Sequence, residues 1–233
     1  RQIIEESIME ETIKIFGIEI ENITAKETMK KAVEMLDQEG LSLVELLTMD
    51  TLLLGQDDAE LKEAVGEMDL VLSGSAELYE AAEIQEARCL QRPSERPFIQ
   101  MFLKYLQKSK KRVYLLTESE PEKEILLSML EEKFRGMMIV GSGVFPEECS
   151  DELVVNEVNG LEADCILSVL PSPRQELFAV RNRALLNVHM WLGCSNLIQE
   201  KYEEAMHIHR FRNFLVRKFF KHQVGLEKRQ DEE

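Results

Sequence analysis

The stretch ADCILSVLPSPRQELF, residues 163–178, passes from an apolar run through a proline-rich turn into a helix-compatible segment. The run CILSVL at 165–170 has the length and composition of a buried strand. Pro171 and Pro173 stiffen its exit. By spacing alone, Ser172 as a cap and Pro173 at the first helical position predict an ordinary helix start.

The polar side chains of this turn also suit ligand binding. Ser172, Arg174 and Gln175 carry donors for phosphate, uracil or sugar hydroxyls, and Glu176 can accept from a ribose or sugar hydroxyl. We therefore hold two interpretations of residues 171–176, a helix start and a ligand-binding turn.

Working outward from this strand, strand-like and helix-like patterns alternate along the chain to about residue 200. A capping box at Thr24 and Glu27 starts a predicted helix through Leu36, and Asp57 is the expected cap of another. Such alternation predicts a Rossmann-like α/β fold, a mainly parallel sheet with helices on both faces. The expected strands are residues 14–20, 43–48, 69–72, 112–117, 137–141, 165–170 and 187–193.

Charge divides the chain into two regions. The 233 residues carry a formal charge of -16, which argues against a general nucleic-acid partner because phosphate binding needs a basic face. Residues 205–226 nevertheless contain five Arg or Lys and no acid. We expect an α/β domain at 1–204, a basic helical appendage at 205–226 and a disordered charged tail at 227–233.

Cysteine spacing and hydropathy indicate the cellular compartment of the protein. Cys89, Cys149, Cys165 and Cys194 form no C-x-x-C pair, which favours reduced thiols over a disulfide or a zinc site. Residues 1–11 are too acidic for a signal peptide, and no run of 18 apolar residues occurs. We therefore expect a cytoplasmic protein.

Ligands of open parallel sheets bind beyond the carboxyl ends of the strands, so residues that follow strands are the candidates for a site. Four such places are 48–50, 73–75, 141–143 and 171–176. The pair Gly141 and Gly143 lacks the third glycine of a dinucleotide fingerprint, which disfavours a nucleotide-binding oxidoreductase. His207 and His209 stand in a basic, helix-like setting where positions i and i+2 diverge, which disfavours a metal pair.

Several blocks together resemble the WecG/TagA/CpsF family of bacterial glycosyltransferases in content and order. The most specific is the turn Ser172-Pro173-Arg174-Gln175-Glu176 after a hydrophobic strand, where the family has Gly-x-Pro-Lys-Gln-Glu. The other blocks are GIEIENITAKET (17–28), DLVL (69–72), SERP (94–97), RVYLLTESEP (112–121) and IVGSGVF (139–145).

The resemblance implies transfer of an N-acetylhexosamine, of the N-acetylmannosamine type, from a UDP-sugar to an undecaprenyl-diphosphate-linked acceptor, with no metal cofactor. This reaction would serve cell-surface polysaccharide or teichoic-acid synthesis. It implies that Thr48 is the active-site threonine, with Asp50 where the family usually has Asn. The implied substrate-binding residues are Arg96, Ser172, Arg174, Gln175, Glu176, Gly141, Ser73 and Gly74.

One departure from the family bears on activity. The family has a presumed catalytic Asp in the turn after its DLVL-like strand, where this chain has Ser73, Gly74 and Ser75. Either Asp50 or Glu77 acts as the base, or the chain is a weak or inactive homologue that serves as a UDP-sugar-binding, scaffold or regulatory protein.

The basic C-terminal segment allows two interpretations. As a helix, it places Arg210, Arg217 and Lys221 on one stripe, and a second stripe carries Phe211, Leu215 and Phe219. Such a helix could lie on an anionic membrane or pack on the acidic body. The family has a membrane-associating appendage with functional arginines, which favours a peripheral location at the inner face of the cytoplasmic membrane. A homo-oligomer stays open.

Overall fold

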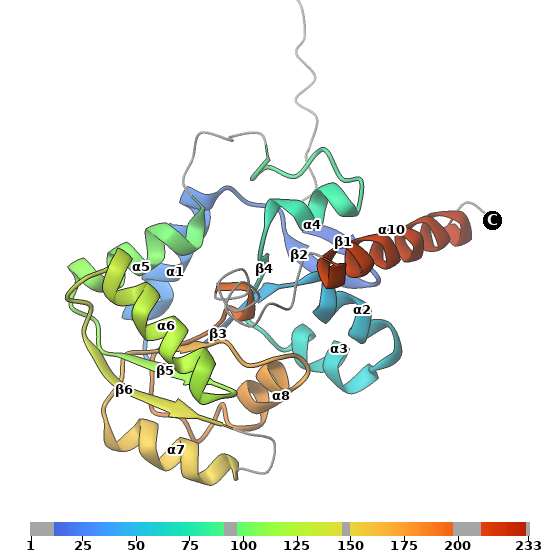
Figure 1. The fold of residues 1–233 in the computed structure, drawn as a ribbon. Coiled ribbons are helices and arrows are strands. Elements are labelled where there is room, and N and C mark those ends of the chain that lie inside the picture. The colour runs from blue at the N-terminus through green and yellow to red at the C-terminus, as the bar shows by residue number, and fades with distance from the viewer. Residues whose placement is uncertain (1–11, 91–96, 146–149, 198–210, 232–233) are drawn as a thin grey trace, which may run out of the picture.

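Six parallel strands form one sheet at the centre of the protein, in the order β4-β3-β8-β7-β5-β6 (Figure 1). The computed structural model describes residues 12–90, 97–145, 150–197 and 211–231, the last range from residue 215 with side chains. This sheet confirms the predicted parallel α/β fold. Its strands are β3 Ser42–Leu47, β4 Leu70–Ser73, β5 Val113–Thr117, β6 Ile139–Val144, β7 Cys165–Ser168 and β8 Met190–Gly193.

Helices cover both faces of the sheet and bury its apolar side chains. On one face, α1 (Ala25–Asp37), α5 (Phe98–Lys108) and α6 (Glu120–Lys133) pack on Val44, Leu115 and Leu167 of the sheet. The three helices lie together in Figure 1. The opposite face is covered by α2 (Met49–Asp57), α3 (Ala59–Gly66), α4 (Ala76–Ala81), α7 (Asp151–Gly160) and α8 (Arg174–Arg181).

The first expected strand is instead a separate hairpin. Residues Thr12–Ile15 form β1 and Ile18–Glu21 form β2, paired antiparallel outside the main sheet. Phe16 and Gly17 both adopt positive φ, 51° and 72°, as the two central residues of a tight hairpin turn do. The prediction of one strand across 14–20 was wrong because this turn reverses the chain.

One helix starts at its predicted capping residue, and another starts one residue later than predicted. Thr24 and Glu27 form the expected capping box at α1, with the Thr24 backbone N–H donating to Glu27 Oε2 at 2.8 Å. Asp57, however, is the last residue of α2, and Asp58 is the residue that accepts from Leu61 N–H at the start of α3. Two adjacent acids made that choice ambiguous from sequence.

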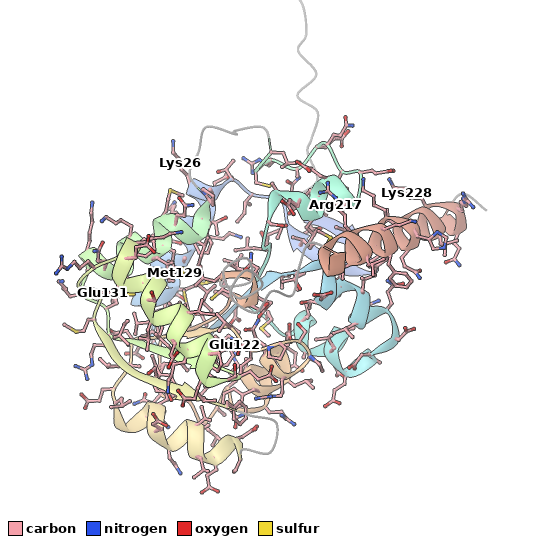
Figure 2. The ribbon with its side chains drawn as sticks, in the orientation of Figure 1. Lys26, Glu122, Met129, Glu131, Arg217 and Lys228 are labelled. Carbon is pink, nitrogen blue, oxygen red and sulfur yellow. The ribbon has the colours of Figure 1, made fainter. Side chains whose placement is uncertain are left out.

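The C-terminal helix α10 (Phe211–Asp231) packs on α2 and α4 of the body. Phe220 is fully buried and meets the Phe16 ring edge-on at a centroid distance of 5.4 Å. Figure 2 labels Arg217 and Lys228 on this helix. They pair with Glu80 at 3.4 Å and Glu83 at 3.2 Å. This is the packed arrangement that the sequence left open beside the membrane one.

Residues 227 to 231, which we expected to be disordered, continue α10 to Asp231. The Glu227 carboxylate accepts from the Phe16 backbone N–H at 3.3 Å, a tertiary contact invisible to composition. The outer side of α10 exposes Leu215, Phe219 and Leu226. No helix in the described part of the chain is both long and apolar enough to cross a membrane.

The neighbouring phenylalanines of α10 provide a test of its docking. Phe220→Ala removes a fully buried ring and should lower the free energy of unfolding by about 3 to 5 kcal/mol. Phe219→Ala removes a ring that is 53% exposed and serves as the matched control, with an expected change within about 1 kcal/mol. Urea denaturation of both variants measures the difference. Equal losses would contradict the docked orientation.

Candidate active site

The segments that follow strands β3 and β7 bring polar side chains together at one edge of the sheet. Thr48 follows β3 and is the N-cap of α2, with its hydroxyl accepting from Thr51 N–H at 3.1 Å. Ser172 follows β7, two positions before α8 begins. Strands β3 and β7 are separated by β8 alone. The parallel arrangement therefore brings the two candidate segments together, as the strand-exit rule requires.

A continuous chain of hydroxyl contacts joins these segments. Thr48 Oγ1 lies 2.9 Å from Thr51 Oγ1, which lies 2.8 Å from Ser172 Oγ. The Ser172 hydroxyl then donates to Glu176 Oε1 at 2.6 Å. Thr48 and Ser172 are half-buried, whereas Thr51 and Glu176 are buried. The chain runs from an accessible hydroxyl to an enclosed carboxyl group.

Gln175 faces the interior, contrary to the expectation that its amide faces a ligand. It is fully buried and donates from Nε2 to Glu45 Oε1 at 2.8 Å. Glu45 lies in the middle of β3 and is also fully buried. A side chain at Gly193 of β8 would occupy the space of the Glu45 carboxyl. The first turn of α8 thus directs Gln175 and Glu176 toward the sheet, where both side chains are buried. Their role in substrate binding stays a prediction.

Glu45 and Glu176 form a buried pair of carboxyl groups whose charged forms are stabilised to different degrees. Burial raises the pKa of Glu45 well above its usual value, and the charge of Glu176 raises it further against one opposing donor, Gln175. Burial also raises the pKa of Glu176, but the Ser172 hydroxyl and the Glu176 backbone N–H favour its charged form. We infer that the pair shares one proton, held by Glu45, and that Glu176 is the ionised member.

Arg174 is the partly buried cation of the turn. Its guanidinium pairs with Glu118 Oε1 at 3.1 Å, just beyond β5, and lies over the Phe145 ring at 4.7 Å from its centroid. The side chain is 18% exposed, and its Nε and Nη2 have no hydrogen-bond partner among the described residues. A cation beside a helix N-terminus is suited to a phosphate oxygen.

The turn after β4 leaves no room for a side chain at Gly74. Gly74 N–H donates to Leu47 O at 2.8 Å, and Asn196 Nδ2 donates to Gly74 O at 2.6 Å. A Cβ on Gly74 would come within 2.7 Å of Leu47 O and 3.0 Å of Asn196 Nδ2. A carboxylate at this position would therefore have to displace backbone. The Ser73 hydroxyl is occupied locally, donating to Ser75 O at 2.7 Å.

The other predicted site residues lie away from these hydroxyl contacts, or their roles stay predictions. Gly141 lies inside β6 rather than beyond it, where a Cβ would meet Leu161 and Tyr114, so close packing explains this glycine. Asp50 is in the first turn of α2, half-buried. Arg217 and Lys221 are on α10, and Glu77 is exposed in α4. Arg96, Arg210, His207, His209 and Cys149 lie outside the described residues.

Sequence reasoning missed four residues that shape the site, namely Glu45, Thr51, Gly193 and Asn196. Glu45 had a visible signal, since it is an acid inside the apolar strand LVELLT. The other three had no such signal, because the contacts that matter join residues far apart in the chain: Thr51 to Ser172, Gly193 to Glu45 and Asn196 to Gly74. Cys165 and Cys194 are buried, as expected, and the three described cysteines form no disulfide.

Comparison with protein-family models assigns the chain to a family. Residues 13–199 match the model of the Glycosyl transferase WecG/TagA/CpsF family. The match covers the hairpin, the sheet and the polar carboxyl edge and ends before α10. No curated protein matches the chain.

The shared proton predicts how stability depends on pH. The unfolded chain releases the Glu45 proton near the usual pKa of 4.5, whereas the folded protein retains it. The folded state therefore binds more protons above that pH, and the free energy of unfolding falls as pH rises, by up to about 1.4 kcal/mol per pH unit. Glu45→Gln, which cannot ionise, should flatten this slope in urea denaturation at pH 5, 6.5 and 8.

Glu63→Gln, at an exposed position of α3, is the control and should retain the slope of the unmodified protein. Parallel slopes for Glu45→Gln and the unmodified protein would show that Glu45 is ionised in the folded state.

Proposed function

The chain belongs to the WecG/TagA/CpsF family of glycosyltransferases, and from this premise we propose that it transfers an N-acetylhexosamine from a UDP-sugar to an undecaprenyl-diphosphate-linked acceptor. The family match carries this proposal. The polar edge beyond β3 and β7 supports it, because hydroxyl contacts join Thr48 after β3 to Ser172 after β7, two positions before Arg174. The acceptor class places the proposed reaction at the cytoplasmic face of a membrane, in cell-surface polysaccharide or teichoic-acid synthesis.

The donor diphosphate would bind at the N-terminus of α8. Arg174 opens this helix, so its guanidinium and the helix dipole both favour an anion there. Glu118 is the present partner of Arg174 and its side chain is 42% exposed, so it can move aside. We therefore assign Arg174 to the diphosphate, with Glu118 as the carboxylate that the diphosphate replaces.

A second candidate function is a UDP-sugar-binding protein without turnover, acting as a scaffold or regulator. The packing at Gly74 favours it, since the turn after β4 has no carboxylate and no space for one. Thr48 and Arg174 do not depend on that turn, so donor binding would persist. Titration with UDP-sugars together with a transfer assay separates the two functions, because the second predicts binding and no product.

The transfer assay follows from the proposed substrates. Purified protein is incubated with a panel of UDP-N-acetylhexosamines and an undecaprenyl-diphosphate-linked amino-sugar acceptor, with and without EDTA. The enzyme proposal expects a lengthened lipid-linked product from at least one donor, unaffected by EDTA because no metal cofactor is proposed. Binding of a donor without product from any of them would favour the second function.

Substitutions at Arg174 and Glu118 should change UDP affinity in opposite directions. Arg174→Gln should weaken binding by about 10- to 100-fold, the equivalent of one charged hydrogen bond. Glu118→Gln should strengthen it, because a competing carboxylate is removed. Arg181→Gln, at the other end of α8 and paired there with Asp151, is the matched control. Calorimetric titration with UDP measures all three, and unchanged affinity for Arg174→Gln would rule out the assignment.

The exposed side of α10 is the surface that we propose for membrane association. Leu215, Phe219 and Leu226 are apolar and exposed there, and Lys218 and Lys221 are exposed beside them. Phe219→Asp should reduce sedimentation with anionic vesicles without loss of thermal stability. Binding should also weaken in 1 M salt, where the Debye length is about 3 Å. Full-length protein that stays in the supernatant at low salt would contradict membrane association.

A further inference from the structure

We propose that Thr48, Thr51, Ser172 and Glu176 form a proton relay in which Thr48 receives the proton of an acceptor hydroxyl and Glu176 is its final acceptor. The inference deepens the proposed glycosyl transfer and rests on it. It also supplies a proton acceptor for a site in which the turn after β4 provides none. Thr48 alone among the four would touch the substrate, and the others would act through it.

The ionised carboxylate fixes the direction of every hydrogen bond in the chain. A carboxylate only accepts, so the Ser172 hydroxyl donates to Glu176 Oε1 at 2.6 Å. Ser172 Oγ must then accept from the Thr51 hydroxyl at 2.8 Å, and Thr51 Oγ1 from the Thr48 hydroxyl at 2.9 Å. Each hydroxyl uses its single proton toward Glu176.

This direction determines what Thr48 can recognise. Its own proton points to Thr51, and one lone pair accepts from Thr51 N–H at 3.1 Å. The second lone pair remains for a donor from outside. Thr48 therefore presents an acceptor to the ligand, which suits the hydroxyl of a sugar and not a phosphate oxygen.

Two donors favour the charged form of Glu176, namely the Ser172 hydroxyl and its own backbone N–H, against the opposing effect of burial. Glu45 of β3 is close enough to interact with Glu176, and burial together with the charge of Glu176 raises the pKa of Glu45 well above its usual value. Cys194, the residue after β8, lies near Glu45, and burial raises the pKa of its thiol, which keeps it neutral. Arg174 of α8 is paired with Glu118. Burial raises the pKa of Glu176 above its usual value, toward the working pH of a general base.

Glycosyl transfer and proton transfer take place together. The acceptor oxygen bonds to the anomeric carbon of the donor sugar while the bond from that carbon to the UDP oxygen breaks, and its electron pair leaves on UDP. The acceptor proton passes to Thr48 Oγ1, Thr48 passes its proton to Thr51, Thr51 to Ser172, and Ser172 to Glu176 Oε1. After product release the proton returns along the same hydroxyls to water.

Thr51→Val and Glu176→Gln test the relay. Valine has the shape of threonine without the hydroxyl, and Thr51 is 1% exposed. Both variants should lower kcat by about 100-fold or more, the usual contribution of a general base, with UDP-sugar affinity within about threefold of the unmodified protein. Glu176→Gln should also lose the fall in kcat at acid pH that protonation of Glu176 produces.

Thr28→Val is the matched control. Thr28 is 3% exposed and donates to Thr24 O at 2.9 Å in α1, away from the site. Its kcat and pH profile should equal those of the unmodified protein. A Thr51→Val enzyme that retains kcat, or a Glu176→Gln enzyme that retains the acid limb of the profile, would overturn the relay.

If the unmodified protein transfers no sugar, the proposed enzyme function is overturned. A separate measurement then tests the relay. Carbon-13 NMR titration of the glutamate carboxyls, with Glu176→Gln for assignment, reports the charge of Glu176 directly. The relay requires Glu176 ionised at pH 7 and a pKa at least about one unit higher in Ser172→Ala, which removes its hydroxyl donor. A protonated Glu176 at pH 7, or no shift in Ser172→Ala, would overturn it.

Discussion

Glu45 stands in the middle of β3 without access to water, so its carboxyl group has to find partners inside the protein. Gln175 supplies an amide donor at 2.8 Å, and Gly193 leaves the space. These contacts link β3, β8 and the first turn of α8. They turn Gln175 and Glu176 inward, whereas Arg174 of the same turn stays partly exposed. The arrangement of the carboxyl edge depends on where this one group is buried.

The two carboxyl groups and the hydroxyl groups of Ser172, Thr51 and Thr48 form one network that runs from fully buried to half-buried residues. We assign the shared proton to Glu45 and the charge to Glu176, and the hydroxyls of Ser172 and Thr51 connect that carboxyl group to Thr48. Two carboxyls in different environments thus take different protonation states, as acid and base assignments in enzymes usually require. The same network fastens α2 to the turn before α8, so a change in the charge of Glu176 reaches both walls of the site.

The C-terminal helix shows how one amphipathic pattern can serve two surfaces. Phe220 and Val224 bury against the body, while Leu215, Phe219 and Leu226 face outward. The apolar residues predicted for a membrane-facing stripe were Phe211, Leu215 and Phe219, and the last two are indeed exposed. The docked side was not identified because consecutive phenylalanines at 219 and 220 give no indication of which one turns inward.

The sequence by itself determined the parallel α/β fold, the capping box of Thr24 and Glu27 and the strand exits at Thr48 and Ser172, because apolar periodicity and caps act within a few residues. It also carried the family, through the ordered blocks between residues 13 and 199. Only the tertiary structure decided that residues 12–21 form a hairpin, that Gln175 and Glu176 face inward, and that Gly74 has no room for a side chain. Each of these outcomes depends on partners far away in the chain, such as Glu45 for Gln175 and Asn196 for Gly74, and no local pattern encodes such distances.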